Sequence, residues 1–553
     1  MVGRHFYAPL QQTVRPTMET GPGVDRPGAG RRWVLIETGG NQRYIFGSNR
    51  LRHVVGASQL VHDVGTAWVR EATDRLGLSP DSSVMAVSGK ALLLVDSAEA
   101  GRAIVREVTG RALREAPGMR VTGAVGPAFD PTDDGAHEPA RAEAYRRHAA
   151  IRAARPDPLV RDRVFPWHRL CRDSGLPAAG LEVYGEGEEP VPASAGMLAR
   201  SRARDRAQRR LREKLGEQLA TVVPVHLDVL RHSGWVAVVH ADGNGVGRIF
   251  HRFNEHVARV EGVAQTSLAG SAQYQRAVSV ELDTATWQAV RDAVAQLVAD
   301  RADEDMSGRL LPIVIGGDDV TVACDAALAV PFVQAYAAAF ARRTAAQPQL
   351  SAITEAATGH VGLTASAGIA VVKSHHPFAT AYGLAEALTV SAKRFTSTGR
   401  PLAAFDFHVA HTSTLRELAE LREYVHLDDG TAVARHAGPY LLDPAEQLPA
   451  ELRHRSVELL DELDRGLDSD GWLSGVQAHA LREAADRNLA EYRRQLELLV
   501  SRIHHRDRAR ELLDVQSDRF LRLFDVLHLR GLRLEAPARS AAETEPTPVG
   551  GAR

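Results

Sequence analysis

The distribution of apolar and polar positions divides the first part of the chain into alternating strands and helices. Short apolar, β-branched runs predict strands, and apolar residues spaced three and four apart predict helices. The expected strands cover residues 33–37, 83–87, 92–95 and 120–125, and the expected helices cover residues 49–76 and 97–116. This order, β-α-β-β-α-β, is the ferredoxin-like arrangement.

The same order recurs in the second half of the chain, offset by about 200 residues and with an extra helix before the hairpin. The expected strands cover residues 235–239, the two arms of a hairpin at 310–324, residues 360–372 and a short edge strand at 401–405. The expected helices cover residues 248–260, 283–299, 325–343 and 378–395. We therefore expect an α+β fold with two ferredoxin-like palm (nucleotide cyclase-like) domains, followed by a helical domain.

The segments around these two units have different compositions. Helical spacing is also found at 140–155 and 197–219 and, toward the end, at 412–425, 449–467, 474–505 and 507–529. The expected organisation is a disordered leader at 1–30, a degenerate first palm at 31–130, an arginine-rich helical linker at 131–232, a second palm at 233–410, a helical domain at 411–534 and a disordered tail at 535–553.

Composition narrows the class of protein. The chain has 553 residues, and its 67 basic residues nearly cancel 69 acidic ones, so any contact with nucleic acid must come from a local patch. Two cysteines exclude a disulfide framework. No apolar run is long enough to cross a membrane, and we expect a cytoplasmic protein without a membrane partner.

The second hairpin carries two adjacent acids at its turn, in the run Gly316-Gly317-Asp318-Asp319. Two carboxylates held side by side repel each other, and a divalent cation with oxygen ligands is the simplest way to keep both ionised. The corresponding turn of the first palm, residues 88–91, reads Ser-Gly-Lys-Ala and has no acid. The chemistry is therefore expected in the second palm.

A third carboxylate, Asp242, ends the first strand of the second palm, and in this fold that strand lies beside the hairpin. With the carbonyl of Gly243, the three acids would form an all-oxygen site suited to Mg²⁺ or Mn²⁺. The glycines at 243, 245 and 247 would offer backbone N–H groups to a triphosphate at a helix N-terminus. Lys393, at the far end of a later helix, is placed to contact phosphate. This set predicts a two-metal nucleotidyl site.

Three other features favour structural roles. The arginine-rich helix at 197–219 is interpreted as a solvated, ion-paired face rather than a phosphate contact. His168 and Cys171 are spaced like metal ligands, but a structural turn is favoured over a zinc site because no second pair stands nearby. His62-Asp63 falls within a first-palm helix without companion ligands, and we interpret it as a coincidence.

From residue 31 to about 534, the chain resembles the large, palm-containing polymerase/cyclase subunit of type III CRISPR effector complexes. The motifs that carry the resemblance are GGDD at 316–319, the strand ending at Asp242, SAGIA at 366–370, AKR at 392–394, Asp-Phe-His at 406–408, and residues 40–46 and 51–58 of the first palm. The resemblance implies synthesis of cyclic oligoadenylate messengers from ATP in antiviral defence, with RNA and small effector subunits as partners, and it allows an oligomer.

Carried over by position, the resemblance makes Asp242, Asp318 and Asp319 catalytic and, with Gly243, metal-binding. The implied nucleotide-binding residues are Gly243, Asn244, Gly245, Gly247, Gly316, Gly317, Ser366 and Lys393. Two departures stand out: family members commonly begin with an HD nuclease domain, for which no room is expected here, and the segment at Cys171 looks like a remnant of the family's zinc element.

Two other functions stay open. The chain could be a catalytically silent scaffold that binds RNA or partner subunits through the arginine-rich helix and the helical end. It could also be a dinucleotide cyclase of the GGDEF type that uses GTP. Against the latter, the fourth motif position is Asp319 and Val320 follows, where that family has Glu and then Phe.

Overall fold

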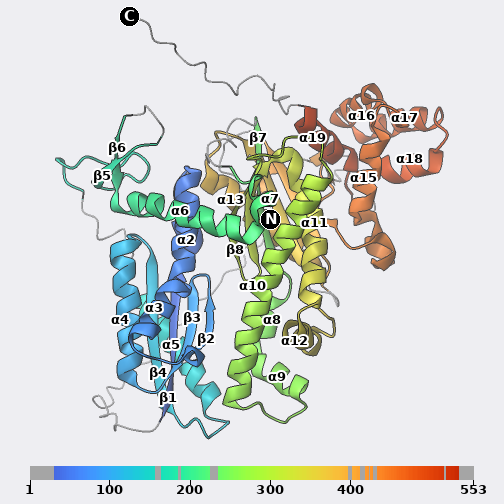
Figure 1. Ribbon diagram of the computed structural model, residues 1–553. Helices are drawn as coiled ribbons and strands as arrows, with labels where there is room; N and C mark the ends of the chain where they lie inside the picture. Colours follow the sequence, from blue (N-terminus) through green and yellow to red (C-terminus); the bar gives the residue numbers. More distant parts are fainter. Residues whose placement is uncertain are drawn as a thin grey trace, which may run out of the picture.

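The computed structural model describes residues 30–155, 164–184, 189–224, 234–396, 401–411, 418–422, 424–426, 432–515 and 519–534 (Figure 1). Apart from Gly30, the expected leader at 1–30 and tail at 535–553 lie outside the described residues. Among the helices in these ranges, none combines the length and apolar character needed to cross a membrane.

The first sheet has the ferredoxin-like topology expected from the sequence. Its elements are β1 (Arg31–Gly39), α1 (Asn41–Ile45), α2 (Leu51–Gly65), α3 (Ala67–Arg75), η1 (Pro80–Ser82), β2 (Ser83–Val87), β3 (Lys90–Val95), α4 (Ala98–Glu115) and β4 (Arg120–Phe129). The strand order is β2-β3-β1-β4, with every pair antiparallel. Ser97 caps α4, because its side chain accepts a hydrogen bond from the N–H of Ala100.

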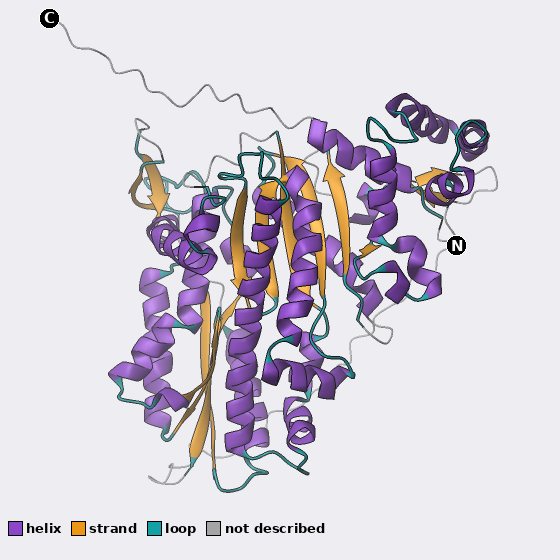
Figure 2. Ribbon diagram, turned by 45° about the vertical axis from the view of Figure 1, so that its right-hand side comes forward, coloured by secondary structure: helices purple, strands orange, loops and turns teal. Residues whose placement is uncertain are grey.

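The second sheet repeats this topology and extends it. Its elements are β7 (Trp235–Gly243), α8 (Val246–His251), α9 (Phe253–Glu261), α10 (Leu268–Ala299), β8 (Leu310–Gly316), β9 (Asp319–Asp325), α11 (Ala326–Ala345), α12 (Pro348–Thr358), β10 (Ala365–Lys373), α13 (Phe378–Ala392), η4 (Lys393–Thr396), β11 (Ala404–Ala410) and β14 (Tyr440–Leu441). The order β10-β7-β9-β8 reproduces the order of the first sheet, so the α+β fold with two ferredoxin-like units is confirmed. Figure 2 shows α10 and α11 over one face of this sheet.

Two expectations for the second sheet are wrong. The helix expected at 283–299 begins earlier, at Leu268, because the Ser267 side chain accepts a hydrogen bond from the N–H of Gly270 and starts the helix there. The strand expected at 401–405 spans Ala404–Ala410 and is not at the edge: it pairs in parallel with β10 on one side and with β14 on the other.

The linker places a long helix between the two palms. Its elements are α5 (His137–Ala154), β5 (Ala178–Glu182), β6 (Val191–Ser194), α6 (Ala195–Leu215) and α7 (Glu217–Ala220). Helix α6 packs along α2 so closely that a Cβ added at Gly56 would lie 1.8 Å from the carbonyl oxygen of Arg200. Only a residue without a Cβ fits at this crossing.

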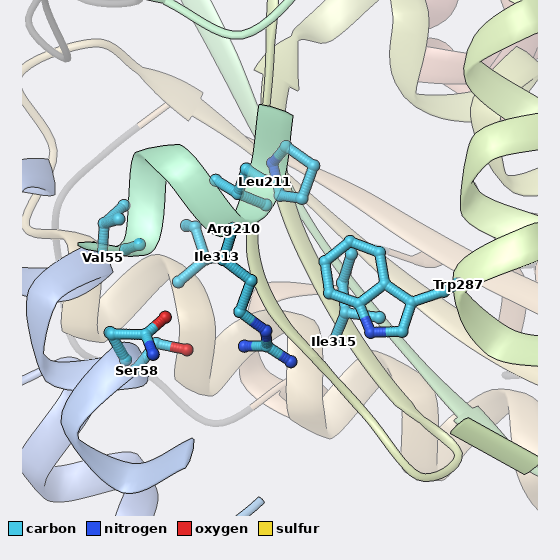
Figure 3. Close-up of a pocket in the computed structure, with 10 residues that line it drawn as sticks. Val55, Ser58, Arg210, Leu211, Trp287, Ile313 and Ile315 are labelled. Atoms are coloured by element: carbon cyan, nitrogen blue, oxygen red, sulfur yellow. The ribbon is translucent and has the colours of Figure 1, made fainter. Parts of the chain in front are cut away.

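The arginine-rich helix was predicted to present a solvated, ion-paired face, and this prediction is wrong at two arginines of α6. Arg200 is 7% exposed, with its guanidinium 4.4 Å from the ring centre of Tyr44 in the first palm. Arg210 lies 5.2 Å from the ring centre of Trp287 in the second palm. Figure 3 shows Arg210 and Trp287 lining a cavity of about 20 Å³, room for one water molecule. Elsewhere ion pairs do occur, as between Arg206 and Asp63 at 3.0 Å. The helix therefore bridges the palms.

The C-terminal region is mainly helical, as expected, with shorter helices. Its elements are α14 (Leu418–Leu421), β12 (Tyr424–His426), β13 (Ala432–Ala434), η5 (Ala445–Gln447), η6 (Ala450–Arg455), α15 (Val457–Gly466), α16 (Gly475–Arg487), α17 (Leu489–Val500), α18 (Arg506–Leu513) and α19 (Arg522–Leu534). The helix expected at 412–425 is wrong at its end, because β12 pairs with β13 there; residues 412–417 and 423 lie outside the described residues. The helix expected at 474–505 breaks at Asn488, whose side chain caps α17.

Candidate nucleotide and metal site between the palms

The register of the second sheet brings the predicted acids together at one end. Asp242, the penultimate residue of β7, pairs directly with Asp319 of β9, and the N–H of Gly243 donates to the carbonyl of Asp318 at 3.2 Å. Gly317 has φ +63°, which a glycine adopts without strain, and its carbonyl accepts a 2.5 Å hydrogen bond from the Thr286 hydroxyl. The β8–β9 turn is thus held against the end of β7.

Gly243 allows this close approach. A Cβ at position 243 would lie 2.8 Å from Cβ of Asp318 and 3.1 Å from its Oδ2. Since real Cβ contacts are not that short, any side chain here would push the Asp318 carboxyl away. The glycine at this position therefore serves the placement of Asp318, a role that the sequence did not indicate.

The carboxylates perturb one another. Burial, followed by the charge of Asp242 and a hydrogen bond to its side chain, raises the pKa of Asp318 to about 8. Burial and the same charge raise the pKa of Asp319 to about 7, although Lys393 opposes that shift. Like charges held in a partly desolvated site favour the protonated form. The three acids therefore bind protons more tightly than isolated acids do. A bound cation would offset the same repulsion and stabilise the ionised carboxylates.

Lys393 lies on the acids rather than apart from them. It follows α13 as the first residue of η4, and its Nζ contacts Oδ2 of Asp242 and lies 3.3 Å from the carbonyl oxygen of Gly243. The ammonium group stands where the sequence predicted a metal, between a carboxylate and a carbonyl. These two donors are therefore arranged to hold a positive charge.

Asp319 has a different environment from the other two acids. Its Oδ1 is buried and lies 3.3 Å from Nδ1 of His240, which is also 3.3 Å from the hydroxyl of Thr321. Burial lowers the pKa of His240, so the ring is neutral near pH 7. Within the described ranges, no three His, Cys, Asp or Glu side chains are grouped as metal ligands. The donor set that fits a divalent cation is thus Asp242, the Gly243 carbonyl and Asp318, with Asp319 directed to His240.

The glycine-rich turn is only partly open. Asn244 is 2% exposed and holds the turn to the residue before β10 and to the chain after η4. Its N–H donates to the carbonyl of Thr364 at 2.8 Å, and its Nδ2 donates to the carbonyl oxygen of Leu402 at 3.1 Å. Its side chain is thus buried away from any ligand. Gly245 has φ +81° and precedes the six-residue α8, and Gly247 is exposed with open space around its Cα.

The last predicted nucleotide-binding residue, Ser366, lies on β10 opposite Asp242. It is fully buried, and its hydroxyl has no hydrogen-bond partner among the described residues. Its backbone register puts it at the same end of the sheet as the acids. The structure therefore brings Ser366 to the end of the sheet that carries the acids, with its hydroxyl enclosed by protein.

The first palm closes the other side of the site. Nε2 of Gln42 donates to Oε1 of Glu386 on α13 at 2.7 Å, and the ring of Phe46 stacks on Tyr382 with centroids 3.8 Å apart. The acid-free turn lies directly on the acidic one, since a Cβ at Gly316 would be 3.0 Å from Cβ of Ser88. The two turns are therefore side by side at the interface between the palms.

Sequence reasoning missed several of these neighbours. His240 lies next to Asp319, Tyr382 packs edge-on against His240, and the charge of Glu386 contributes to the raised pKa of Asp319. Nothing in the local pattern of α13 marked them, because their positions read as an ordinary helix face. Residues 40–46 were singled out only through the family resemblance, and the contacts of Gln42 and Phe46 now give that motif a physical role.

Residues 235–400 match the family described as Cas10/Cmr2, second palm domain. This segment is a Cas10/Cmr2 second palm domain. It contains β7 through η4, hence all the acids of the site and Lys393. The match agrees, for this segment, with the resemblance stated from the sequence.

Solved structures of related proteins are similar over a larger part of the chain. A Csm1-Csm4 cassette in complex with cA4 is 13% identical, with 92% of this chain and 70% of that chain covered and a TM-score of 0.49. A Csm1-Csm4 cassette in complex with one ATP is 14% identical, with 92% of this chain and 70% of that chain covered and a TM-score of 0.47. Csm1 in T. onnurineus is 13% identical, with 84% of this chain and 62% of that chain covered and a TM-score of 0.44. No curated protein matches the chain. With TM-scores below 0.5, the assignment of the second palm rests on the family match.

The segment expected to be a remnant zinc element forms a tight turn. The N–H of Cys171 donates to Leu176 O at 2.8 Å, the N–H of Gly175 donates back to Cys171 O at 2.9 Å, and Leu170 bridges to Pro177. His168 is used locally, since its Nδ1 accepts from the N–H of Phe165 at 3.3 Å. Cys171 itself is 2% exposed. Its environment is that of a small buried residue in a structural turn.

Proposed function

We propose that the second palm is a metal-dependent nucleotidyltransferase that makes cyclic oligonucleotide messengers from ATP, in an antiviral system of the type III CRISPR kind. The observation that carries this proposal is that Asp242, Asp318 and Asp319 meet at one end of the sheet, where the ammonium group of Lys393 contacts Asp242. The Cas10/Cmr2 assignment of the segment supports the same conclusion.

The residues that would hold Mg²⁺ or Mn²⁺ are Asp242, Asp318 and the carbonyl of Gly243, with Asp319 next to them. These are hard oxygen donors, which both ions prefer. The lysine ammonium on Asp242 and Gly243 supports this assignment, because it places a positive charge against the same two oxygen donors. When bound, such an ion would neutralise the charge of a triphosphate and orient it.

The chain's own residues would bind and orient the nucleotides. The exposed backbone at Gly245 and Gly247 can donate hydrogen bonds to phosphate, and Lys393 adds a positive charge beside them. In the reaction, a ribose hydroxyl oxygen of one nucleotide forms a bond to the α-phosphorus of an ATP, and the bond to pyrophosphate breaks. Holding the two nucleotides in line between the palms is the main contribution of the fold. The turn at Ser88, which lies against Gly316, gives the second nucleotide a wall from the first palm.

The proposal is tested with the double variant Asp318→Ala and Asp319→Ala. Purified protein is incubated with each labelled nucleoside triphosphate and Mn²⁺, with and without RNA, and the products are identified by mass. We expect the wild type to form cyclic oligoadenylate and the variant to form none, while its circular dichroism is unchanged. The matched control is Asp133→Ala with Asp134→Ala, an adjacent acidic pair on an exposed turn.

Other outcomes would assign a different function. Product formation that persists in the Asp318/Asp319 variant would exclude this site as the catalyst. Products made from GTP alone would favour the dinucleotide cyclase. RNA binding without metal and without any turnover would favour the scaffold, with RNA or small effector subunits as partners. A rise in turnover on adding RNA would identify RNA as an activator.

A further inference from the structure

A second site lies at the other end of the second sheet, against the C-terminal helices. It is a cavity of about 600 Å³ between the end of β11, the segment around Arg422, and helices α16 and α19. We call it the His/Arg cavity because its lining includes Arg422, Arg435, Arg482, His408, His411 and His528. Its volume falls in the range of small-molecule sites. Part of it is the Asp-Phe-His motif that the proposed catalytic site does not use.

The register of the sheet separates this cavity from the acids. Ala410, in its wall, pairs with Val372 of β10, and Val372 pairs with Val236 of β7. Val236 precedes Asp242 by six residues on the same strand, so at about 3.3 Å per residue the Ala410 end of the cavity lies about 20 Å along the strands from the acids. One ligand of nucleotide size cannot occupy both.

The charges of the cavity favour an anion. Arg422 is 9% exposed, its Nη2 donates to Oδ2 of Asp406 at 2.6 Å, and its Nε is buried in the cavity wall with no partner among the described residues. Arg435 pairs with Asp486 at 2.8 Å, and Arg482 is exposed on α16. Three guanidinium groups thus line one cavity, and they can form charge-assisted hydrogen bonds with an anion.

The acids of the lining do not cancel these cations. Oδ2 of Asp525 already accepts hydrogen bonds from the N–H of Ala437 and the hydroxyl of Tyr440, both at 2.7 Å. Burial raises the pKa of Asp525 to about 7, which reduces its negative charge near neutral pH. Glu420 is exposed at the mouth. Burial and the charge of Arg422 lower the pKa of His408 to about 4, in agreement with a positive local potential.

The same lining offers flat rings for a base. Phe407 and Phe524 form the floor, and the rings of His411 and His528 lie 6.1 Å apart at the wall. We propose that the His/Arg cavity binds a nucleoside phosphate, with the phosphate at the arginines and the base among the rings. Such a ligand would act as an effector at a distance from the acids.

The test uses the full chain in EDTA, an azido derivative of AMP as photolabel, and AMP or inorganic phosphate as competitor. We expect saturable labelling within peptides that contain residues 407–411 or 524–528, with AMP competing at lower concentration than phosphate. Arg482→Glu should weaken labelling about tenfold, because one charge-assisted contact is lost and repulsion is added. Arg482 is exposed, so this variant should fold.

The matched control is Arg487→Glu, an exposed arginine on the same helix that pairs with Glu491 and does not line the cavity. It should label as the wild type does. The Asp318→Ala, Asp319→Ala variant should also label normally, which separates this proposal from the proposed function. Equal affinity in the Arg482 and Arg487 variants, labelling confined to other peptides, or equal competition by phosphate and AMP would overturn the proposal.

Discussion

Replacing Asp318 by asparagine should make the metal-free protein more stable, although it removes a proposed catalytic group. The pKa of Asp318 is raised to about 8 in the folded chain, against an ordinary value of 3.8. The folded state therefore binds this proton more tightly than the unfolded state does. Stability is unaffected below about pH 4, where both states are protonated, and falls as the pH rises toward 8.

The expected change in the free energy of unfolding follows from the pKa shift of Asp318. Each pH unit between the two pKa values costs about 1.4 kcal/mol, which sets a ceiling of about 4 kcal/mol at pH 7. Partial exposure of the carboxyl and local relaxation reduce this, and we expect a gain of about 1–2 kcal/mol for Asp318→Asn at pH 7. Near pH 4 the gain should be close to zero, because Asp318 is then protonated and neutral in the folded state, as asparagine is, and the penalty builds up only above its ordinary pKa of 3.8.

The assay is urea unfolding in EDTA at pH 4, 7 and 8.5, with the free energy of unfolding compared between wild type and variant. Asp133→Asn serves as the control, since Asp133 is exposed and asparagine can still accept the hydrogen bond from Gly135. With saturating Mg²⁺ the order should reverse, because the ion stabilises the form that binds it better. A variant that is less stable than wild type in EDTA at pH 7, or a gain independent of pH, would refute the electrostatic reasoning.

Two further predictions concern the contacts between the palms. Gly56→Ala should lower the free energy of unfolding by about 1–3 kcal/mol, because its Cβ would lie 1.8 Å from Arg200 O; Gly110→Ala, with its nearest atom at 3.5 Å, should be neutral or stabilising in the same denaturation assay. Phe46→Ala should cost about 3–5 kcal/mol of packing against Tyr382 and should increase hydrogen exchange in α13, whereas Phe46→Leu should cost less; unchanged exchange would show that the stack does not hold the palms together.

Much of each palm could be read locally. The order of strands and helices follows from apolar spacing and from turn residues, which act over a few positions, and both sheets have the expected topology. Boundaries moved where a single capping side chain decided them, as at Ser267. The position of β11 could not be predicted, because a strand lies inside a sheet only when another strand pairs with its free edge.

In the candidate site too, some features could be predicted from the sequence and others could not. The sequence indicated that three acids would meet, since the register of a ferredoxin-like sheet is nearly fixed by its topology. It did not reveal that Asn244, which reads as part of an open turn, is buried by Thr364 and Leu402, or that Lys393 contacts Asp242. These contacts join residues 120 to 158 positions apart, so no local pattern records them.

The sequence by itself determined two duplicated palms, one with an acidic turn and one without, because strand order and turn chemistry are encoded within each unit. Only the tertiary structure decided that the two turns lie against each other, that Arg200 and Arg210 of α6 lie against an aromatic ring of the first and of the second palm, and that a cationic cavity forms behind β11. The physical reason is that burial and charge at these places depend on which distant surfaces meet, and that is settled by the packing of the whole chain.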